Sequence, residues 1–198
     1  MTITRLESID LKRYKVYIDY EYSFMLYKTD IKKYHIEEEK DISNDVYQEI
    51  IEDTVYRRAK KKALDILKYM DRTEAELCSK LKQAYYTDDI ISRTVEYVKS
   101  YHYIDDERYL MNYIQLKKAT KSRKQIQAEL YRKGIDKHLV GKYFESELDN
   151  DDIALKKAIG KKAVHPENLS YEEKQKLIGS LCRKGFLYDD IVKNIENM

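Results

Sequence analysis

Apolar and polar residues alternate near the start of the chain, whereas later residues follow a helical period. Residues 12–20 carry apolar or aromatic side chains at alternate positions, as a half-buried strand requires: Tyr14, Val16, Ile18 and Tyr20. The aromatic run at residues 22–27 follows, so the pattern predicts a β-hairpin, with residues 3–7 as a candidate third strand. Because a lone hairpin is marginally stable in water, we expect it to pack on the helices that follow.

The helical period begins after Ser43, which is a candidate N-cap. Apolar residues then return mostly at steps of three and four: Val46, Ile50, Val55, Ala59, Ala63, Ile66, Leu67 and Met70. This pattern fits one long helix, and it fits equally well two helices that meet near Asp53–Thr54.

Three later segments repeat one arrangement, in which a helix ends, the chain turns and a new helix begins. These segments are residues 77–91, 126–140 and 177–192. Leu81, Leu130 and Leu181 occupy the matching position, and an Arg-Lys-Gly triplet occurs at residues 132–134 and again at 183–185. A period of about fifty residues with helical content predicts tandem helical units, each of which needs its neighbours to bury an apolar face.

Capping signals divide each unit into three helices. Thr73 with Glu76, and Ser170 with Glu173, have the spacing of capping boxes, and Ser122 and Asp136 are further candidate caps. The first expected helix ends near residue 70. The later ones span about 73–83, 88–99, 106–119, 123–133, 137–148, 151–162, 171–184 and 189 to the end.

The turn glycines have a direct structural explanation. Gly134 and Gly185 lie just past a helix end, where a left-handed backbone is commonly needed, and the basic residues before them favour the helix dipole. Helix termination therefore explains both triplets, with a shared binding role as the alternative. Tyr85 stands at the equivalent place in the first unit, so we expect that turn to be built in another way.

The predicted fold is mainly α-helical, with three tandem three-helix units in an elongated array after a small N-terminal β-hairpin-like segment. The predicted division of the chain is a β-rich extension with the start of a linking helix (1–50), then helical repeats at 51–100, 101–148 and 149–198.

The charge balance of the chain limits the kinds of partner surface it can have. Of the 198 residues 37% are charged, but 38 Lys and Arg nearly balance 36 Asp and Glu, and the net charge is only +2. Any surface for nucleic acid must therefore be a local patch. No apolar run approaches the length of a membrane span, and no secretory signal is recognisable. Cys78 and Cys182 are expected to be small buried residues in a reducing compartment. We therefore expect a cytoplasmic, monomeric protein without a membrane partner.

The acidic sequence YIDDERY (103–109) raises the question of catalysis or metal binding. If Asp105 is an N-cap, Asp106 and Glu107 lie in the first turn of a helix, where the dipole stabilises negative charge. Residues 149–152 resemble a calcium loop only superficially, since the glycine and the distal glutamate are missing, and helix capping is the favoured interpretation. The four histidines show no metal-ligand spacing. We predict a non-enzymatic protein with no catalytic residue, metal or cofactor.

Basic stretches recur in successive units. They occur at residues 57–62, 117–124, 156–157 and 161–162. A solvated helix face is the simplest explanation of each, but together they could form a discontinuous basic strip for phosphates or an acidic protein groove.

The 20 tyrosines are expected mainly in the core, with base stacking by a few as the alternative.

Several of these features together resemble the RecX family, bacterial regulators of the RecA recombinase. They are the three helical units, YIDDERY opening the second, the Leu-x-x-Lys-Gly-[Ile/Phe] turns at 130–135 and 181–186, and RRAKKKALDILKYMDRTEAELCSKL at 57–81. The resemblance covers essentially the whole chain. Tyr85–Tyr86 and Asp19–Glu21 depart from the family's turns, which leaves local turn geometry open.

The resemblance implies a negative regulator that binds the RecA filament on single-stranded DNA. Such a protein would inhibit the ATPase, strand-exchange and co-protease activities of RecA, and so modulate recombination, DNA repair and the SOS response. The alternative is a helical protein that binds DNA directly through its basic patches and acts without RecA. The density of positive charge in the middle unit gives the candidate filament- or DNA-facing residues: Lys117, Lys118, Lys121, Arg123, Lys124, Arg132 and Lys133.

Overall fold

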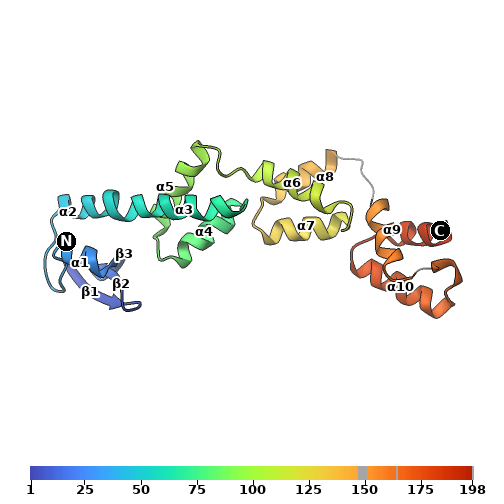
Figure 1. The fold of residues 1–198 in the computed structure, drawn as a ribbon, viewed down its shortest axis with the longest axis horizontal. Coiled ribbons are helices and arrows are strands. Elements are labelled where there is room, and N and C mark those ends of the chain that lie inside the picture. Colours follow the sequence, from blue (N-terminus) through green and yellow to red (C-terminus); the bar gives the residue numbers. More distant parts are fainter. Residues whose placement is uncertain (147–150, 164, 198) are drawn as a thin grey trace. The chain divides into compact units, whose positions relative to one another are not determined.

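The computed structural model describes residues 1–146, 151–163 and 165–197. The chain begins with an antiparallel sheet in the order β1–β2–β3, formed by β1 (Ile3–Ser8), β2 (Arg13–Ile18) and β3 (Glu21–Tyr27). Nearly all the remaining regular structure is helical (Figure 1). The predicted class is therefore confirmed, including the third strand. Contacts divide the chain into two compact units, Met1–Asp105 and Asp106–Met198.

The helices of the first unit follow the sheet in order. They are α1 (Lys28–Lys33), α2 (Asn44–Glu49), the π-helical segment η1 (Ile50–Tyr56), α3 (Arg57–Tyr69), α4 (Glu74–Gln83) and α5 (Asp88–Ser100). The second unit contains α6 (Asp106–Lys117), α7 (Arg123–Arg132), α8 (Lys137–Ser146), α9 (Asp152–Gly160), the 3₁₀ turn η2 (Pro166–Asn168), α10 (Tyr171–Arg183) and α11 (Tyr188–Glu196). The end of the expected helix at residue 148, the adjoining repeat boundary, and Asp149 lie outside the described residues.

After Ser43 the chain forms one continuous helical run that contains a π-helical segment. The helical path runs without a break from α2 through η1 into α3, and Asp53–Thr54 lie in the middle of η1. The wider turns of a π-helix shift the phase of the apolar stripe. Ile50, Ile51 and Val55 are buried in the core that includes the sheet, and the five-residue step from Ile50 to Val55 matches the i→i+5 pattern of a π-helix.

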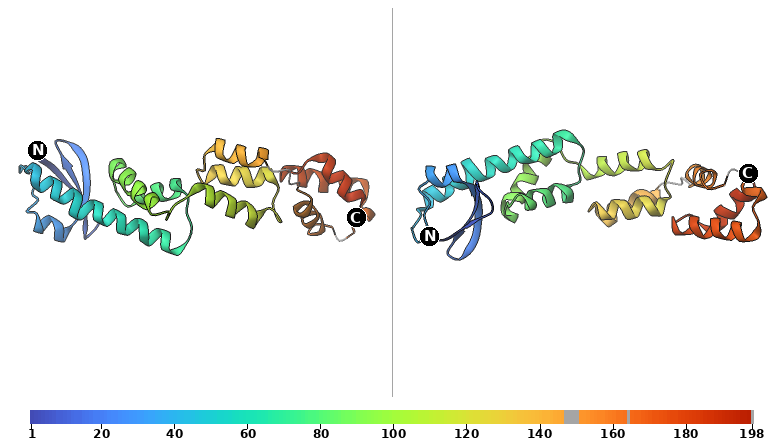
Figure 2. Two further views of the ribbon diagram at one scale, coloured as in Figure 1. Left: turned by 90° about the horizontal axis from the view of Figure 1, so that it is seen from above. Right: turned by 60° about the horizontal axis from the view of Figure 1, so that its bottom comes forward.

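The sheet packs on this helical run, as a marginal hairpin requires. Val16, Phe24 and Leu26 of the sheet share one buried core with Ile50 and Val55 of η1, and the views of Figure 2 show the sheet beside α2 and the start of α3. The β2–β3 turn is made without glycine, because Asp19 and Tyr20 themselves adopt left-handed φ values of 47° and 70°.

Three further apolar cores follow along the chain, each built from three helices. Leu81, Leu130 and Leu181 each lie at 0% exposure in a different one of these cores, which accounts for the leucine repeat. The division into segments at residues 50, 100 and 148 stays a prediction.

The helix caps agree well with the sequence. Both predicted capping boxes form, a third joins Ser122 to Gln125, and Asp136 Oδ1 accepts the backbone N–H groups of His138 and Leu139 at 2.9 and 3.1 Å. Within YIDDERY, α6 begins at Asp106, with Asp106 and Glu107 in its first turn. The acidic cluster therefore starts a helix, as predicted.

The three repeated turns share one backbone geometry. The N–H groups of Tyr86, Ile135 and Phe186 donate to the carbonyls of Leu81, Leu130 and Leu181 at 3.2, 3.1 and 3.3 Å. The residue before each donor is left-handed, with φ of 66° at Tyr85, 80° at Gly134 and 85° at Gly185. The expectation that the Tyr85 turn is built differently is therefore wrong. The Tyr22 hydroxyl donates to the Tyr85 carbonyl and helps to fix this unusual tyrosine conformation.

Alanine in place of Gly185 should lower the free energy of unfolding by about 2–3 kcal/mol. An L-residue in the left-handed region costs about 1–2 kcal/mol, and an added Cβ at this position would lie 2.7 Å from Lys124 Cβ, so local structure must also shift. Urea denaturation followed by circular dichroism measures the change. The matched control is G179A in the middle of α10, where the nearest atom is 3.7 Å away and alanine should stabilise the helix. Equal urea midpoints for the two variants would contradict this explanation.

Candidate functional site

The seven basic residues singled out in the sequence lie along the end of α6, the α6–α7 loop and both ends of α7, but they do not form one surface. Lys117 and Lys133 lie beside a pair of tyrosines on α6, whereas Arg123 makes its contacts with Phe144 and Asp151. Lys118, Lys124 and Arg132 are exposed. The seven predicted residues therefore lie in separate local environments.

The tyrosine pair is formed by Tyr109 and Tyr113, one helical turn apart on α6. Their ring centroids are 6.0 Å apart and the rings are 15° from parallel. The Lys133 ammonium lies 5.3 Å from the Tyr109 centroid and 5.6 Å from that of Tyr113, and the Lys117 ammonium lies 5.9 Å from Tyr113. These distances place both cations within the range of attraction to an aromatic ring. We call Tyr109, Tyr113, Lys117 and Lys133 the tyrosine–lysine cluster.

Glu129 on α7 borders the tyrosine–lysine cluster and fixes one of its rings. It accepts a hydrogen bond from the Tyr113 hydroxyl at 2.7 Å and pairs with Lys121 at 2.5 Å. Burial alone would raise the pKa of Glu129, but the hydrogen bonds from Lys121 and Tyr113 outweigh it and lower that pKa. Burial and the Glu129 carboxylate raise the pKa of Tyr113 to about 12, so the hydroxyl stays a donor. Lys121 therefore neutralises a neighbouring carboxylate and is poorly placed to bind a partner.

Arg123 has a structural task at the junction of α7, α8 and α9. Its guanidinium donates to the Phe144 carbonyl and lies 5.3 Å from the centroid of the Phe144 ring. Its backbone N–H donates to Asp151 Oδ1 at 2.9 Å. Asp151 is the N-cap residue of α9, which agrees with the capping predicted for residues 149–152, but its side chain makes no capping hydrogen bond.

The neighbouring residues Ser122 and Lys124 contact the turn after α10. The Ser122 hydroxyl donates to the Lys184 carbonyl, and Lys124 Cβ lies close to Gly185. The Arg-Lys-Gly turn at residues 183–185 is therefore a packing contact, which favours the structural explanation of that triplet. In the other triplet, Lys133 belongs to the tyrosine–lysine cluster.

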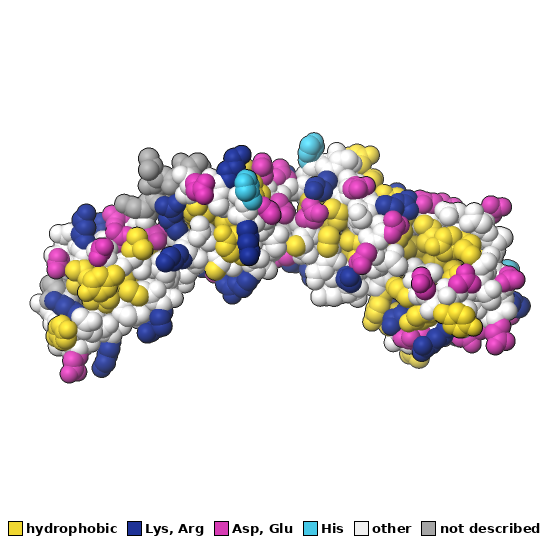
Figure 3. All heavy atoms as spheres, turned by 180° about the vertical axis from the view of Figure 1, so that it is seen from behind, with side chains coloured by type: hydrophobic (Ala, Val, Ile, Leu, Met, Phe, Trp, Pro, Cys, Tyr) yellow, Lys and Arg dark blue, Asp and Glu magenta, His cyan; other side chains and the backbone are white. Residues whose placement is uncertain are grey.

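Some of the other basic side chains are engaged within the fold, whereas Arg57, Lys61, Lys62, Lys156, Lys157, Lys161 and Lys162 are exposed. Arg58 pairs with the buried Asp30, and the Lys60 ammonium lies 4.4 Å from the Tyr56 ring centroid and 5.1 Å from that of Tyr97. On the face drawn in Figure 3, basic and acidic side chains are interspersed. Charges of both signs are mixed on this face, and the tyrosine–lysine cluster, where two cations meet a pair of aromatic rings, is the candidate site for an anionic partner.

The tyrosines of this cluster were not predicted from the sequence, because tyrosine is by default a core residue. A usable signal was present, since Tyr109, Tyr113 and Lys117 recur every four residues and must share one face of α6. Half-buried aromatic rings flanked by cations can stack on a base or bind a phosphate or carboxylate.

The remaining expectations about chemistry concern cysteines, metals and membranes. Cys78 is half-buried and Cys182 is exposed, so the expected burial of Cys182 is wrong. Among the described residues, no group of three or more His, Cys, Asp or Glu side chains could hold a metal ion. Within the same residues, every helix is too short or too polar to cross a bilayer.

This chain is similar in sequence to known proteins and similar in fold to solved structures. A family model described as the first three-helix domain of RecX matches residues 59–97. The regulatory protein RecX of Clostridium acetobutylicum is 30% identical over 202 residues, which cover 96% of this chain and 92% of that protein. The regulatory protein RecX of Finegoldia magna is 30% identical over 208 residues, which cover all of both chains.

Two crystal structures extend the comparison to the fold. One, of regulatory protein RecX, matches with a TM-score of 0.66 over 100% of this chain and 99% of its own, at 21% identity. The other, of RecX from Lactobacillus salivarius, matches with a TM-score of 0.61 at 30% identity and covers 72% of this chain and 95% of its own. The agreement with relatives along nearly the whole sequence shows that this chain belongs to the RecX family.

Proposed function

We propose that this protein is a negative regulator of RecA that binds the RecA filament on single-stranded DNA. In this proposal it inhibits the ATPase, strand-exchange and co-protease activities of RecA and so restrains recombination and the SOS response. The observation that carries the proposal is the similarity to proteins named regulatory protein RecX over nearly the full length of the chain.

Inhibition of this kind needs binding and no catalysis. A ligand that binds one state of a filament more tightly than another shifts the population toward the favoured state. Three helical cores in tandem provide several contact surfaces on one chain, and weak contacts add through their effective concentration. We propose that the tyrosine–lysine cluster is one of these contacts, because Lys117 and Lys133 bring two positive charges to one half-buried aromatic pair.

The first experiment measures the ATPase activity of RecA on single-stranded DNA with increasing amounts of this protein. We expect the rate to fall to a low plateau once the filament is saturated. Order of addition separates the steps involved: inhibition of preformed filaments indicates filament binding, whereas inhibition only before assembly indicates capture of free RecA or DNA. No effect over a wide concentration range would contradict the proposal.

Direct binding to DNA without RecA is a second candidate, which the stacked Tyr109–Tyr113 rings and their neighbouring lysines favour. Such rings accept unpaired bases, and lysines contact the backbone phosphates. Fluorescence anisotropy with a labelled single-stranded oligonucleotide measures this affinity as a function of salt. Strong binding that weakens steeply with salt in the absence of RecA would support the second candidate.

A further inference from the structure

A continuous series of aromatic rings follows the boundary between α3 and α5 and continues past the end of α5, entirely within the first unit (Figure 1). The Lys60 ammonium lies 4.4 Å from the Tyr56 ring centroid and 5.1 Å from that of Tyr97. The Tyr97 centroid is 5.1 Å from that of Tyr101, which is 6.2 Å from that of Tyr103. We call these four tyrosines and Lys60 the tyrosine ladder.

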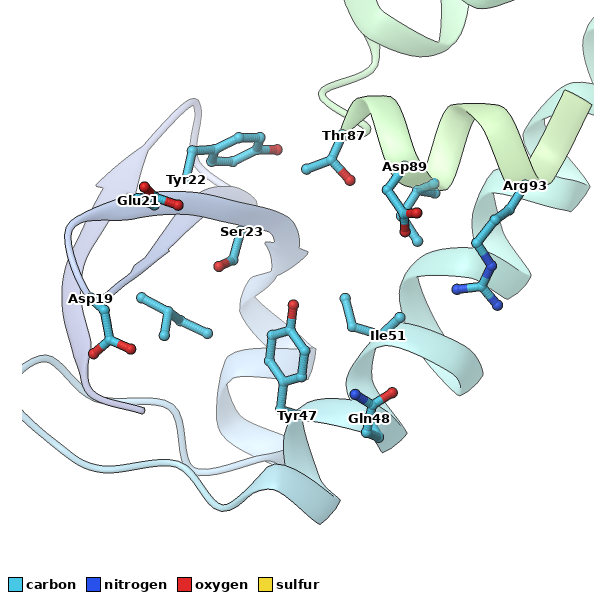
Figure 4. A pocket seen from close by; sticks show the side chains of 12 residues that line it. Asp19, Glu21, Tyr22, Ser23, Tyr47, Gln48, Ile51, Thr87, Asp89 and Arg93 are labelled. Atoms are coloured by element: carbon cyan, nitrogen blue, oxygen red, sulfur yellow. The ribbon is translucent and has the colours of Figure 1, made fainter.

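One end of the tyrosine ladder is held by the fold. The Tyr56 hydroxyl donates to the Arg93 carbonyl at 3.3 Å, and the Arg93 guanidinium lies 4.2 Å from the Tyr56 ring centroid. Figure 4 shows Arg93 extending from α5 toward the helical run, where it donates to both carboxylate oxygens of Glu52 at 2.8 and 2.9 Å. Tyr56 and Tyr97 are half-buried, so this end supports the rings that follow.

The other end of the tyrosine ladder lies at the surface, where Tyr101 is 60% and Tyr103 51% exposed. After α5 ends, the Tyr103 N–H donates to the Val98 carbonyl at 3.0 Å, the same kind of bond that closes the three repeated turns. His102 between the two tyrosines is left-handed, with a φ of 56°, which is a strained conformation for a residue other than glycine. The turn thus leaves two large rings side by side at the surface, with their planes 32° apart.

Positive charge lies beside the tyrosine ladder on α3. Lys60 contacts two of its rings, and Arg57 lies three residues earlier, within one helical turn. Arg57, Lys61 and Lys68 are exposed and share one face of α3, because they follow one another at steps of four and seven residues. In the part of the chain that the structure describes, the side chains of these three residues form no ion pair or hydrogen bond. They are therefore available to an anionic partner.

We propose that the tyrosine ladder binds unpaired bases of single-stranded DNA. The bases stack on the exposed rings of Tyr101 and Tyr103, and the phosphates contact the basic face of α3, as aromatic rings beside a positive surface allow. The exposed carboxylates of Asp53 and Glu96 weaken the positive field, so stacking contributes more to binding than charge does. Duplex DNA fits poorly, because its base faces are already stacked. The inference rests on the proposed contact with single-stranded DNA and adds a site in the first unit, apart from the tyrosine–lysine cluster.

The first test measures affinity by fluorescence anisotropy, with the full-length protein and a labelled oligothymidine strand. A strand of equal length without bases keeps the phosphates, so it should bind on the order of tenfold more weakly. The variant Y101A/Y103A should lose on the order of tenfold in affinity for oligothymidine, whereas Y101F/Y103F keeps the rings and should bind like the wild type. The matched control Y171A/Y188A removes tyrosines that are 78% and 56% exposed on α10 and α11, and it should also bind like the wild type.

Two further measurements examine the phosphate contacts and the place of the bases. Each phosphate contact on a single strand contributes about 0.7 to the slope of log affinity against log salt, so K61Q/K68Q should reduce that slope by about 1–1.5. An unchanged slope would contradict the phosphate contacts on α3. A strand that contains 5-iodouracil should photo-cross-link to Tyr101 or Tyr103.

Three outcomes would overturn the inference. They are equal affinity for strands with and without bases, equal affinity of Y101A/Y103A and Y171A/Y188A, or cross-links confined to Tyr109 and Tyr113. The third outcome would assign the DNA contact to the tyrosine–lysine cluster instead. RecA is absent from these measurements, so a protein that fails them and still inhibits RecA would exclude the tyrosine ladder and leave the proposed function untouched.

Discussion

Reversing the charges of Lys117 and Lys133 together should abolish inhibition of RecA at protein concentrations that saturate the wild-type effect. Both ammonium groups lie close to the tyrosine pair of α6, so the double change to glutamate converts the site from attractive to repulsive for an anionic surface. At about 1–1.5 kcal/mol for each of the two reversed contacts, half-maximal inhibition should need on the order of 30–150 times more protein. The measurement is the ATPase rate of RecA on single-stranded DNA over a titration of each variant.

A matched variant separates this effect from a general change in charge. Lys137 and Lys142 are exposed on α8 of the same three-helix core, so K137E/K142E changes the net charge by the same amount. We expect this control to inhibit RecA nearly as well as the wild type. The K117E/K133E variant should keep its fold, because a cation–aromatic contact at a partly exposed site contributes only about 0.5–1 kcal/mol. A folded K117E/K133E protein with undiminished inhibition would exclude the tyrosine–lysine cluster from the filament contact.

Local signals in the sequence were sufficient for most of the helical architecture. Thr73, Ser122 and Ser170 each precede a helix because their side chains satisfy backbone N–H groups that lack partners within the helix. Gly134 and Gly185 end helices because their left-handed φ favours a residue without Cβ. Such interactions join residues only a few positions apart, so they can be read directly from the order of residues.

The candidate site was harder to predict because charge alone does not show where a side chain points. Arg123 and Lys121 belong to the same basic stretch as Lys117, yet Arg123 is held by the Phe144 carbonyl and Lys121 by Glu129. Each of those partners is eight or more residues away in sequence and comes close only in the folded chain. A basic stretch therefore marks only a region in which some residues support the fold and others remain available for binding.

Tertiary contacts also explain the turns and helices that the sequence did not reveal. Tyr85 adopts the left-handed conformation of a turn glycine, and its carbonyl accepts a hydrogen bond from Tyr22, which lies 63 residues earlier. The short helix α1 was not predicted, since it is held by a contact between Asp30 and Arg58 of α3. In both places a distant partner offsets a weak local preference.

Replacing Asp30 by alanine should cost about 2–3 kcal/mol of unfolding free energy. Asp30 is only 6% exposed, and its Oδ1 accepts from Arg58 at 2.9 Å while Oδ2 caps α1 through the Tyr27 N–H at 2.9 Å. Removing one partner of a buried pair costs about 3–5 kcal/mol, and the expected value is smaller because the Arg58 side chain is 35% exposed. Urea denaturation at pH 7 measures the loss.

The effect of this substitution should depend on pH in a defined direction. Burial alone would raise the pKa of Asp30, but hydrogen bonds from Arg58 and the Tyr27 N–H outweigh it and lower the pKa below its ordinary value. A carboxyl with a lowered pKa in the folded state stabilises the fold at pH values above its unfolded pKa of about 3.9. That stabilisation is lost as the pH falls through the folded pKa, so the difference between wild type and D30A should be largest near pH 7 and shrink below about pH 4.

A double-mutant cycle shows whether the ion pair itself carries the effect. Arg58→Met keeps the apolar stem, and D30A/R58M should lose less than the sum of the two single changes by about 1–2 kcal/mol, because the double variant leaves neither charge without its partner. The same cycle at Lys82 and Asp88, whose side chains are 69% and 81% exposed, should give a coupling below about 0.5 kcal/mol. If the two couplings were equal, or if D30A lost as much at pH 3 as at pH 7, the capping bond and the packing of Asp30 would account for its role without the charge. We expect a larger coupling for Asp30–Arg58 than for Lys82–Asp88, because solvent screens the exposed Lys82–Asp88 pair and is largely excluded from Asp30.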